Sequence, residues 1–357
     1  QLLQLNNAST QYQQYISNGR SANTNLSLEQ NALSGTTTTL QSIQDLIVQA
    51  NSGSNNTGDL QSIATEIQQL EQQLMGTANS KNAQGEYLFA GYSVNTQPFI
   101  RGSSGSVSYV GDNGANSVPL DSGTSVQTGD AGSAVFMNIP TGNGTFTTAA
   151  SAANTGTGVI DAGSVTDPSA WVADPYTIAF TSPTQYTVTD TTTGDVVVPD
   201  GTYDAANGGN IDFNGIEIGI SGAPAAGDSF TVAPSTSTGS IFNTLDSLVS
   251  SLNNAGSSAA ARAQLSSSLA GSLQQIQQAM NRVSTVTTSV GTRISLIGSL
   301  NTSVTAQSTA VATQISNLDS LNYAAATSQY SQEYLALQAA EESYAQLGQL
   351  SLFKYLA

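Results

Sequence analysis

The fold of this chain is decided by residues 269–318, which read LAGSLQQIQQAMNRVSTVTTSVGTRISLIGSLNTSVTAQSTAVATQISNL. One apolar residue recurs here at every seventh position: Leu269, Ile276, Val283, Val290, Ile297, Val304, Val311 and Leu318. Such a repeat keeps one stripe of a helix against a partner helix. At about 1.5 Å per residue the stretch forms a rod on the order of 75 Å long. A rod of this length indicates assembly or architecture.

A second series lies four residues behind the first and completes the 4-3 spacing of a packing seam. It contains apolar residues such as Leu273 and Met280, but also the polar residues Asn301 and Ser308. These two are either tolerated polar positions or residues that fix the register or the number of partner helices.

The N-terminal part of the chain carries a matching helical pattern. Two helices are predicted, separated by the turn-rich loop 51–58, and Asp59 is expected to cap the second helix. A short hairpin is predicted at residues 86–99, where aromatic residues, Gly and Pro come together. The apolar seams of the two helices are Leu26, Leu33, Leu40 and Ile47 in the first and Leu60, Ile63, Ile67, Leu70 and Leu74 in the second.

The middle of the chain predicts strands. Residues 101–234 are rich in Gly, Thr and Asp and contain short alternating runs, such as Tyr176–Phe180 and Tyr186–Val188. Asn214-Gly215 separates two alternating runs, and this pair favours a two-residue hairpin because the turn needs positive φ at both positions.

These patterns predict an α+β fold, in which both termini form a long antiparallel helical bundle or coiled-coil stalk around an inserted, mainly β domain. The predicted domains are an N-terminal stalk segment with a short hairpin at 1–100, an acidic β domain at 101–236, a C-terminal stalk segment at 237–320, and a helix for subunit packing at 321–357. The sevenfold phase changes after Leu318 without Gly or Pro, so we expect the helix to continue with a bend or a new packing partner.

The C-terminal segment is the predicted assembly interface. A new sevenfold series begins there, and the last residues are too apolar to be left exposed on a monomer. A Tyr stripe at helical spacing is usually an interface or a core. The predicted interface residues are Tyr323, Tyr330, Tyr334, Leu337, Tyr344, Leu350, Leu352, Phe353 and Tyr355.

Composition excludes several classes of function. The net charge of −17, with only 7 basic residues, argues against nucleic acid and membranes as partners. The chain has no Cys and no His, so disulfides and Cys/His zinc sites are excluded, and no cofactor is expected. Thirteen of the 24 acidic residues lie between Asp112 and Asp228, where no Lys or Arg occurs, which favours an exposed position for the β domain.

Two further motifs carry a resemblance to a known family. Residues 78–92 read ANSKNAQGEYLFAGY and are followed by TQPF at 96–99, and the chain ends with SLFKYL at 351–356. Together with the helical termini, these motifs resemble the flagellar axial proteins, and within them the hook-associated protein 3 group at the hook-filament junction. FNGI at 213–216 and GDSFTV at 227–232 are similar to the β domain of some members.

The resemblance implies a structural protein and no enzyme. It implies export through the flagellar secretion system without a cleavable signal peptide, with the help of an export chaperone, and an extracellular location in the flagellum. It further implies self-association in a ring between hook-associated protein 1 and flagellin. Family members normally begin with a further helical segment that pairs with the C-terminal helix, so we expect residues 323–357 to be mobile or packed on a neighbour.

Three alternatives stay open on the residues alone. The first is a flagellin filament subunit, and the second is another secreted coiled-coil assembly or adhesin. The third is an enzyme that acts on surface glycans through β-domain carboxylates such as Asp195, Asp200 or Glu217. Such an enzyme would need two facing carboxylates about 5 to 10 Å apart in a cleft.

Overall fold

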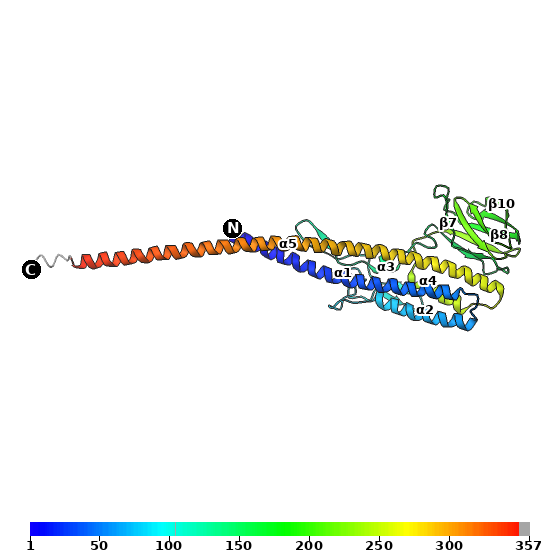
Figure 1. The fold of residues 1–357 in the computed structure, drawn as a ribbon, viewed down its shortest axis with the longest axis horizontal. Coiled ribbons are helices and arrows are strands. Elements are labelled where there is room, and N and C mark those ends of the chain that lie inside the picture. Colours follow the sequence, from blue (N-terminus) through cyan, green and yellow to red (C-terminus); the bar gives the residue numbers. More distant parts are fainter. Residues whose placement is uncertain (104, 350–357) are drawn as a thin grey trace, which may run out of the picture. The chain divides into compact units, whose positions relative to one another are not determined.

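The computed structural model describes residues 1–103 and 105–349, which are helical at both ends of the chain with strands between (Figure 1). The long helices are α1 (Leu2–Ala50), α2 (Thr57–Ala78), α4 (Ile241–Asn253) and α5 (Ala259–Gln349). The predicted α+β class, with helical termini and an inserted β domain, is confirmed. α5 continues through residue 318 without interruption, as the absence of Gly and Pro at the phase change predicted.

The chain divides into two compact units. Unit 1 comprises Gln1–Ser21, Val118–Val126 and the described part of Leu296–Ala357, and unit 2 comprises Ala22–Ser117 and Gln127–Ser295.

Within unit 2, α1 and α5 run antiparallel. Near the start of α5, Arg262 Nη1 donates to the Gly53 carbonyl after α1, at 3.3 Å. Further along α5, Arg293 contacts Asp130, whose backbone N–H donates to Glu29 of α1. The order of these contacts is reversed along the two helices, so the stalk prediction holds for this unit.

The start of α2 differs in detail from the prediction. Asn56 is the N-cap residue, and its side chain accepts hydrogen bonds from the backbone N–H groups of Gly58 and Asp59. Asp59 lies three residues into the helix and accepts the Asn56 N–H at 2.9 Å. This is a reciprocal capping box, and together these contacts satisfy three backbone N–H donors at the start of the helix.

The predicted hairpin at 86–99 is wrong in its position. Residues 79–98 form turns with one isolated bridge between Lys81 and Tyr87, and the hairpin follows as β1 (Phe99–Arg101) and β2 (Val107–Tyr109). Gly91 has φ +67°, and a Cβ atom there would lie 2.2 Å from the Asp112 carbonyl oxygen, so the backbone turns where a strand would continue.

In unit 2, a cluster of aromatic rings packs β1 and the segment that follows it against α4. Phe99 and Phe136 are in edge contact at 5.4 Å, and Phe242 of α4 lies 5.4 Å from Phe99. Phe136 belongs to the short helix α3 (Gly132–Phe136), which follows the small hairpin of β3 (Ser117–Pro119) and β4 (Ser125–Gln127). These rings anchor the segment before the β domain to the helices.

The β domain, residues 146–234, contains two sheets. The five-stranded sheet has the order β10-β9-β8-β13-β5, and in the other sheet β12 pairs with β11, β6 and β7. Buried aromatic and branched residues of both sheets form one core, including Tyr176, Phe180, Ile218 and Phe230. The strands are β5 (Phe146–Ala150), β6 (Val159–Ile160), β7 (Ser164–Val165), β8 (Tyr176–Ser182), β9 (Gln185–Asp190), β10 (Val196–Thr202), β11 (Gly209–Phe213), β12 (Ile216–Ser221) and β13 (Ser229–Pro234).

The Asn-Gly hairpin is confirmed. β11 and β12 are antiparallel, with Phe213 opposite Ile216, and the turn residues Asn214 and Gly215 have φ of 44° and 73°. Positive φ at both positions matches the right-handed twist of the strands that the turn joins.

Within unit 1, the first part of α1 lies against α5. Gly19 is buried, and a Cβ atom there would lie 2.6 Å from Oδ1 of Asn301. Asn18 Nδ2 donates to the Pro119 carbonyl of β3 at 2.9 Å. The close approach at Gly19 gives the polar seam residue Asn301 a specific neighbour.

Candidate assembly surface

The sevenfold series of α5 changes from buried to exposed along the helix. Its members from Leu269 to Val304 are buried, Val311 and Leu318 are half-buried, and Tyr323 is 77 % exposed. In the other seams Leu70 is half-buried, and the buried residues are Leu26, Leu33, Leu40, Ile47, Leu60, Ile63, Ile67 and Leu74. The phase change therefore coincides with the end of intrachain burial on α5.

Beyond Leu318, α5 carries an exposed stripe of large side chains, which we call the tyrosine stripe. Residues seven apart stay on nearly the same side of a helix, and Tyr334 follows Tyr330 by one turn. The Tyr330 and Tyr334 rings are stacked, with centroids 6.3 Å apart and planes at 19°. Its members are Tyr323, Tyr330, Tyr334, Leu337 and Tyr344, all more than half exposed.

Leu335 and Leu347 of the same segment are also exposed, at 69 % and 68 %, and are not among the predicted interface residues. At about 100° per residue, both lie on other sides of the helix than the tyrosine stripe. Neither fits the sevenfold series, and only the density of Leu and Tyr in this segment pointed to them. The predicted residues Leu350, Leu352, Phe353 and Tyr355 lie outside the described residues. The charged residues of 323–349 are Glu333, Glu341 and Glu342, and all three are acidic and exposed.

A tyrosine stripe of this kind can bind a complementary helix. A contiguous exposed apolar surface is characteristic of protein interaction sites. Each aromatic ring can bury about 150–250 Å² against a partner while its hydroxyl reaches the polar edge. The arrangement supplies contact area and no reactive group.

Two charge clusters fix the helices of unit 2. In the first, Glu29 is 1 % exposed, its Oε1 accepts the Asp130 N–H at 3.2 Å, and Arg293 pairs with the Asp130 carboxylate. Burial, followed by the neighbouring Asp130 charge, raises the pKa of Glu29 to about 9. Glu29 is therefore protonated at neutral pH, and its position on α1 is tied to Arg293 on α5.

The second cluster joins α2, β1 and α4. Arg101 pairs with Glu71, and its Nη1 donates to Asp246 Oδ1 at 2.9 Å. Burial, followed by the charge of Asp246, raises the pKa of Glu71 against the lowering effect of Arg101. The Arg101 guanidinium thus forms ion pairs with carboxylates of two different helices, Glu71 of α2 and Asp246 of α4.

The carboxylates of the enzyme alternative lie in different parts of the β domain. Asp195 lies in the turn between β9 and β10, and Asp200 lies in β10, so both belong to the five-stranded sheet, and both are exposed. Glu217 lies in β12 of the other sheet. Among residues 1–103 and 105–349, no group of three His, Cys, Asp or Glu side chains could hold a metal ion. In the same residues, no helix is long and apolar enough to cross a membrane.

Three family models match parts of the chain. Residues 1–94 match the bacterial flagellin N-terminal helical region, and residues 273–356 match the bacterial flagellin C-terminal helical region. Residues 149–234, within the β domain, match the D2-like domain of flagellar hook-associated protein 1. The two flagellin matches fall on the helical termini that form the stalk.

A curated relative of the same kind matches part of the chain. The flagellar hook-associated protein 3 of Salmonella typhimurium is 34 % identical over 139 residues, which is 39 % of this chain and 43 % of that protein. The match therefore spans less than half the length of this curated relative.

Two solved structures extend the similarity over most of the chain. The crystal structure of flagellar hook associated protein-3 from Legionella pneumophila is 30 % identical with a TM-score of 0.85, over 90 % of this chain and 100 % of that one. A crystal structure of the flagellar junction protein FlgL from the same organism is 32 % identical with a TM-score of 0.76, over 81 % of this chain and 96 % of that one.

Proposed function

The chain belongs to the flagellar hook-associated protein 3 family, and on that premise we propose that it joins hook-associated protein 1 at the hook to the flagellin filament. The similarity over the whole length of the Legionella pneumophila protein supports this role. The proposed work is structural: the protein forms a ring through its helical ends and connects two different lattices.

The observation that carries the proposal is the change of burial along α5. The buried seam from Leu269 to Val304 holds the stalk of one subunit together, while the tyrosine stripe beyond Leu318 has no covering partner among the described residues. Burying a large apolar side chain stabilises an association by about 1.5–3 kcal/mol. The stripe thus provides the free energy for contacts between subunits.

The partners and location follow from the same role. We propose self-association in a ring, contact with hook-associated protein 1 on one side and with flagellin on the other, and delivery by an export chaperone to the exterior. A chain without Cys forms no disulfide that would have to be reduced before unfolded export. The acidic residues of this segment and the absence of Lys and Arg from 294–349 favour partner helices with an apolar or basic face.

The structural role also separates this proposal from the enzyme alternative. Of the carboxylates named for that alternative, Asp195 and Asp200 belong to the five-stranded sheet and are exposed, and Glu217 lies in the other sheet. The large exposed side chains of the tyrosine stripe, by contrast, lie on one segment of one helix. We therefore propose a structural protein without catalytic activity.

The experiment that tests the proposal is deletion of the gene in its source bacterium. We expect the cells to make and secrete flagellin but to retain no filament, because the flagellin subunits lack the lattice on which they assemble. Restoring the gene restores the filament. Loss of the major filament subunit itself would instead identify the chain as a flagellin and overturn the proposal.

A further inference from the structure

The β domain is joined to the helices by a narrow neck, residues 139–141 and 235–239. Ile139 and Gly239 exchange backbone hydrogen bonds at 3.1 and 3.0 Å, and the Thr141 N–H donates to the Thr236 carbonyl at 2.9 Å. The Ser235 hydroxyl donates to the Thr141 carbonyl at 2.8 Å. The two chain segments of the neck are thus tied to each other, which makes the neck one connection.

α5 holds the neck at one point. Gln275 Nε2 donates to the Pro140 carbonyl at 3.1 Å, and Gln275 Oε1 accepts the Gly142 N–H at 3.0 Å. Because both ends of the Gln275 amide are used, this contact fixes the base of the β domain on α5.

A second set of contacts joins the β domain to α5 nearer the start of that helix. Gln264 Nε2 donates to the carbonyls of Ala152 and Asn154 at 3.1 and 3.0 Å. Ser267 Oγ accepts the Ile160 N–H at 3.2 Å. At about 1.5 Å per residue, Gln264 and Gln275 lie roughly 16 Å apart along the helix. We call Gln264 and Ser267 the latch.

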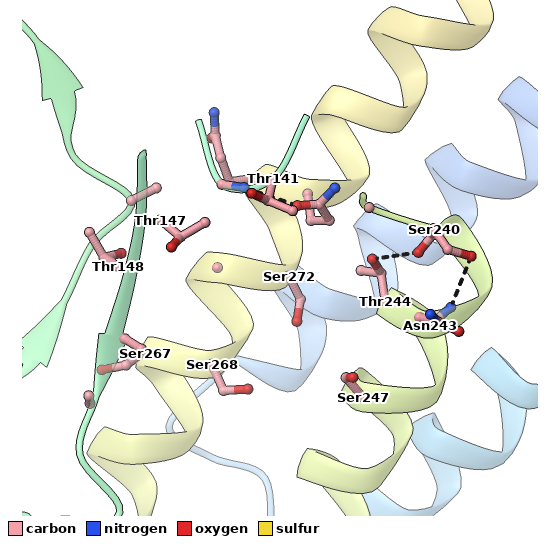
Figure 2. A pocket seen from close by; sticks show the side chains of 18 of the residues that line it. Thr141, Thr147, Thr148, Ser240, Asn243, Thr244, Ser247, Ser267, Ser268 and Ser272 are labelled. Carbon is pink, nitrogen blue, oxygen red and sulfur yellow. Dashed lines mark hydrogen bonds between the residues drawn. The ribbon is translucent and has the colours of Figure 1, made fainter. Parts of the chain in front are cut away.

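A cavity of about 600 Å³ lies between the β domain and the helices, and both Gln264 and Gln275 line it. Figure 2 shows hydroxyl groups around it, from Thr147 of β5, from Ser268 and Ser272 of α5 and from Ser247 of α4. The residues that line it are all Thr, Ser, Asn, Gln, Gly or Ala. The β domain thus rests on α5 through hydrogen bonds beside an uncharged polar space.

Such a contact opens easily. Water replaces each hydrogen bond that is lost, so the net stabilisation per bond is small. Between parts of one chain, relative motion is expected unless the interface is large and hydrophobic. We infer that the β domain swings about the neck, with Gln264 and Ser267 as the latch, and that the cavity provides the space for this motion. The inference concerns the isolated chain and is independent of the proposed junction role.

The test is a distance measurement by pulsed electron paramagnetic resonance. The chain has no Cys, so Gln61→Cys on α2 and Thr192→Cys in the β9–β10 turn, both exposed positions, carry the two nitroxide labels. The latch variant adds Gln264→Ala and Ser267→Ala. A matched control adds Gln277→Ala and Ser284→Ala on α5; the Gln277 side chain donates to Asn281 within the helix and, among the described residues, does not bond the β domain.

A filled variant, Gly271→Leu, tests the role of the cavity. Gly271 lines the cavity, and a Cβ atom there meets nothing within 4 Å, so the side chain enters open space. Gly298→Leu, at an exposed position of α5 where a Cβ atom also meets nothing, controls for the loss of a helix glycine.

We expect the latch variant to show a second distance, with the open population raised on the order of tenfold or more over the parent chain. The filled variant should give a narrower distribution than the parent, and both control variants should match the parent. Circular dichroism and a single cooperative urea transition establish that each variant is folded. Identical distributions in the latch, filled and parent chains would overturn the inference, and so would equal broadening in the latch variant and its control.

Discussion

Gly19 of α1 lies directly against Asn301 of α5, since a Cβ atom on Gly19 would be 2.6 Å from Asn301 Oδ1. The helices therefore approach closely where one side has no side chain and the other has a short polar one. Asn301 is one of the polar residues in the seam, and this contact favours the interpretation that it specifies the register of α1 and α5.

Gly19→Ala should therefore stabilise the protein less than the same change at Gly35, where a Cβ atom meets nothing within 4 Å. A Gly to Ala change inside a helix contributes about 0.5–1 kcal/mol when no contact opposes it. Urea unfolding of Gly19→Ala, Gly35→Ala and each combined with Asn301→Ala measures the difference. When Asn301 is also changed to Ala, Gly19→Ala should stabilise the protein as much as Gly35→Ala does. If the two changes stabilise the parent chain equally, the contact between Gly19 and Asn301 does not oppose a side chain.

Stability should fall as the pH rises toward 9. The pKa of Glu29 is raised to about 9 from the usual 4.5, so the folded state binds the extra proton between these values. The stabilisation is complete below about pH 4.5 and is lost as the pH passes through 9. The raised pKa of Glu71 acts in the same direction.

Glu29→Gln keeps the shape of the protonated side chain and removes the titration. The slope of the urea midpoint against pH, measured from pH 5 to 9.5, should become shallower than in the parent, and the variant should be more stable than the parent at pH 9. An unchanged slope would mean that Glu29 is ionised in the folded protein at neutral pH.

Arg101→Ala should destabilise unit 2 by about 1–3 kcal/mol, because Glu71 and Asp246 lose the guanidinium that they share. The figure is below that of a fully buried pair because the Arg101 side chain is 40 % exposed. Thermal or urea unfolding measures the loss. Adding Glu71→Gln to Arg101→Ala should recover part of it, and a further loss in the double variant would contradict this account.

In the dilute isolated chain, backbone amides of residues 323–349 should exchange with deuterium faster than those of residues 269–304. The first segment is exposed at every residue whose burial is described, whereas the second carries the buried seam. Opening of a helix is easier where few buried contacts oppose it. Mass spectrometry of peptic fragments measures both segments in one experiment, and equal protection would show that the C-terminal segment is stabilised within the monomer.

Features with a period or a turn rule could be predicted from the sequence. The sevenfold repeat of α5 identified six of its buried residues, from Leu269 to Val304, and Asn214-Gly215 identified the β11–β12 hairpin. Both signals are local, because the geometry of a helix or a two-residue turn restricts which residue types fit.

Contacts between polar residues distant in the sequence could not be predicted. Gln264 and Gln275 carry the β domain, but in a chain rich in Gln, Ser and Thr they resemble ordinary surface residues. Glu29 and Asp130 are separated by 101 residues, and only the fold brings them together. The position of the hairpin was also missed, because the turns at 79–98 depend on contacts such as Gly91 with Asp112.

The central claim is that the tyrosine stripe assembles the protein into the junction. The most direct measurement compares filament formation in the deletion strain after complementation with Tyr330→Ser/Tyr334→Ser/Leu337→Ser and with the control Gln338→Ser/Gln346→Ser on the same exposed segment. Secreted amounts and urea transitions of both chains are measured in parallel. We predict that the stripe variant is folded and secreted like the control but leaves the cells without filaments, while the control restores them. Normal filaments with the stripe variant would contradict the account.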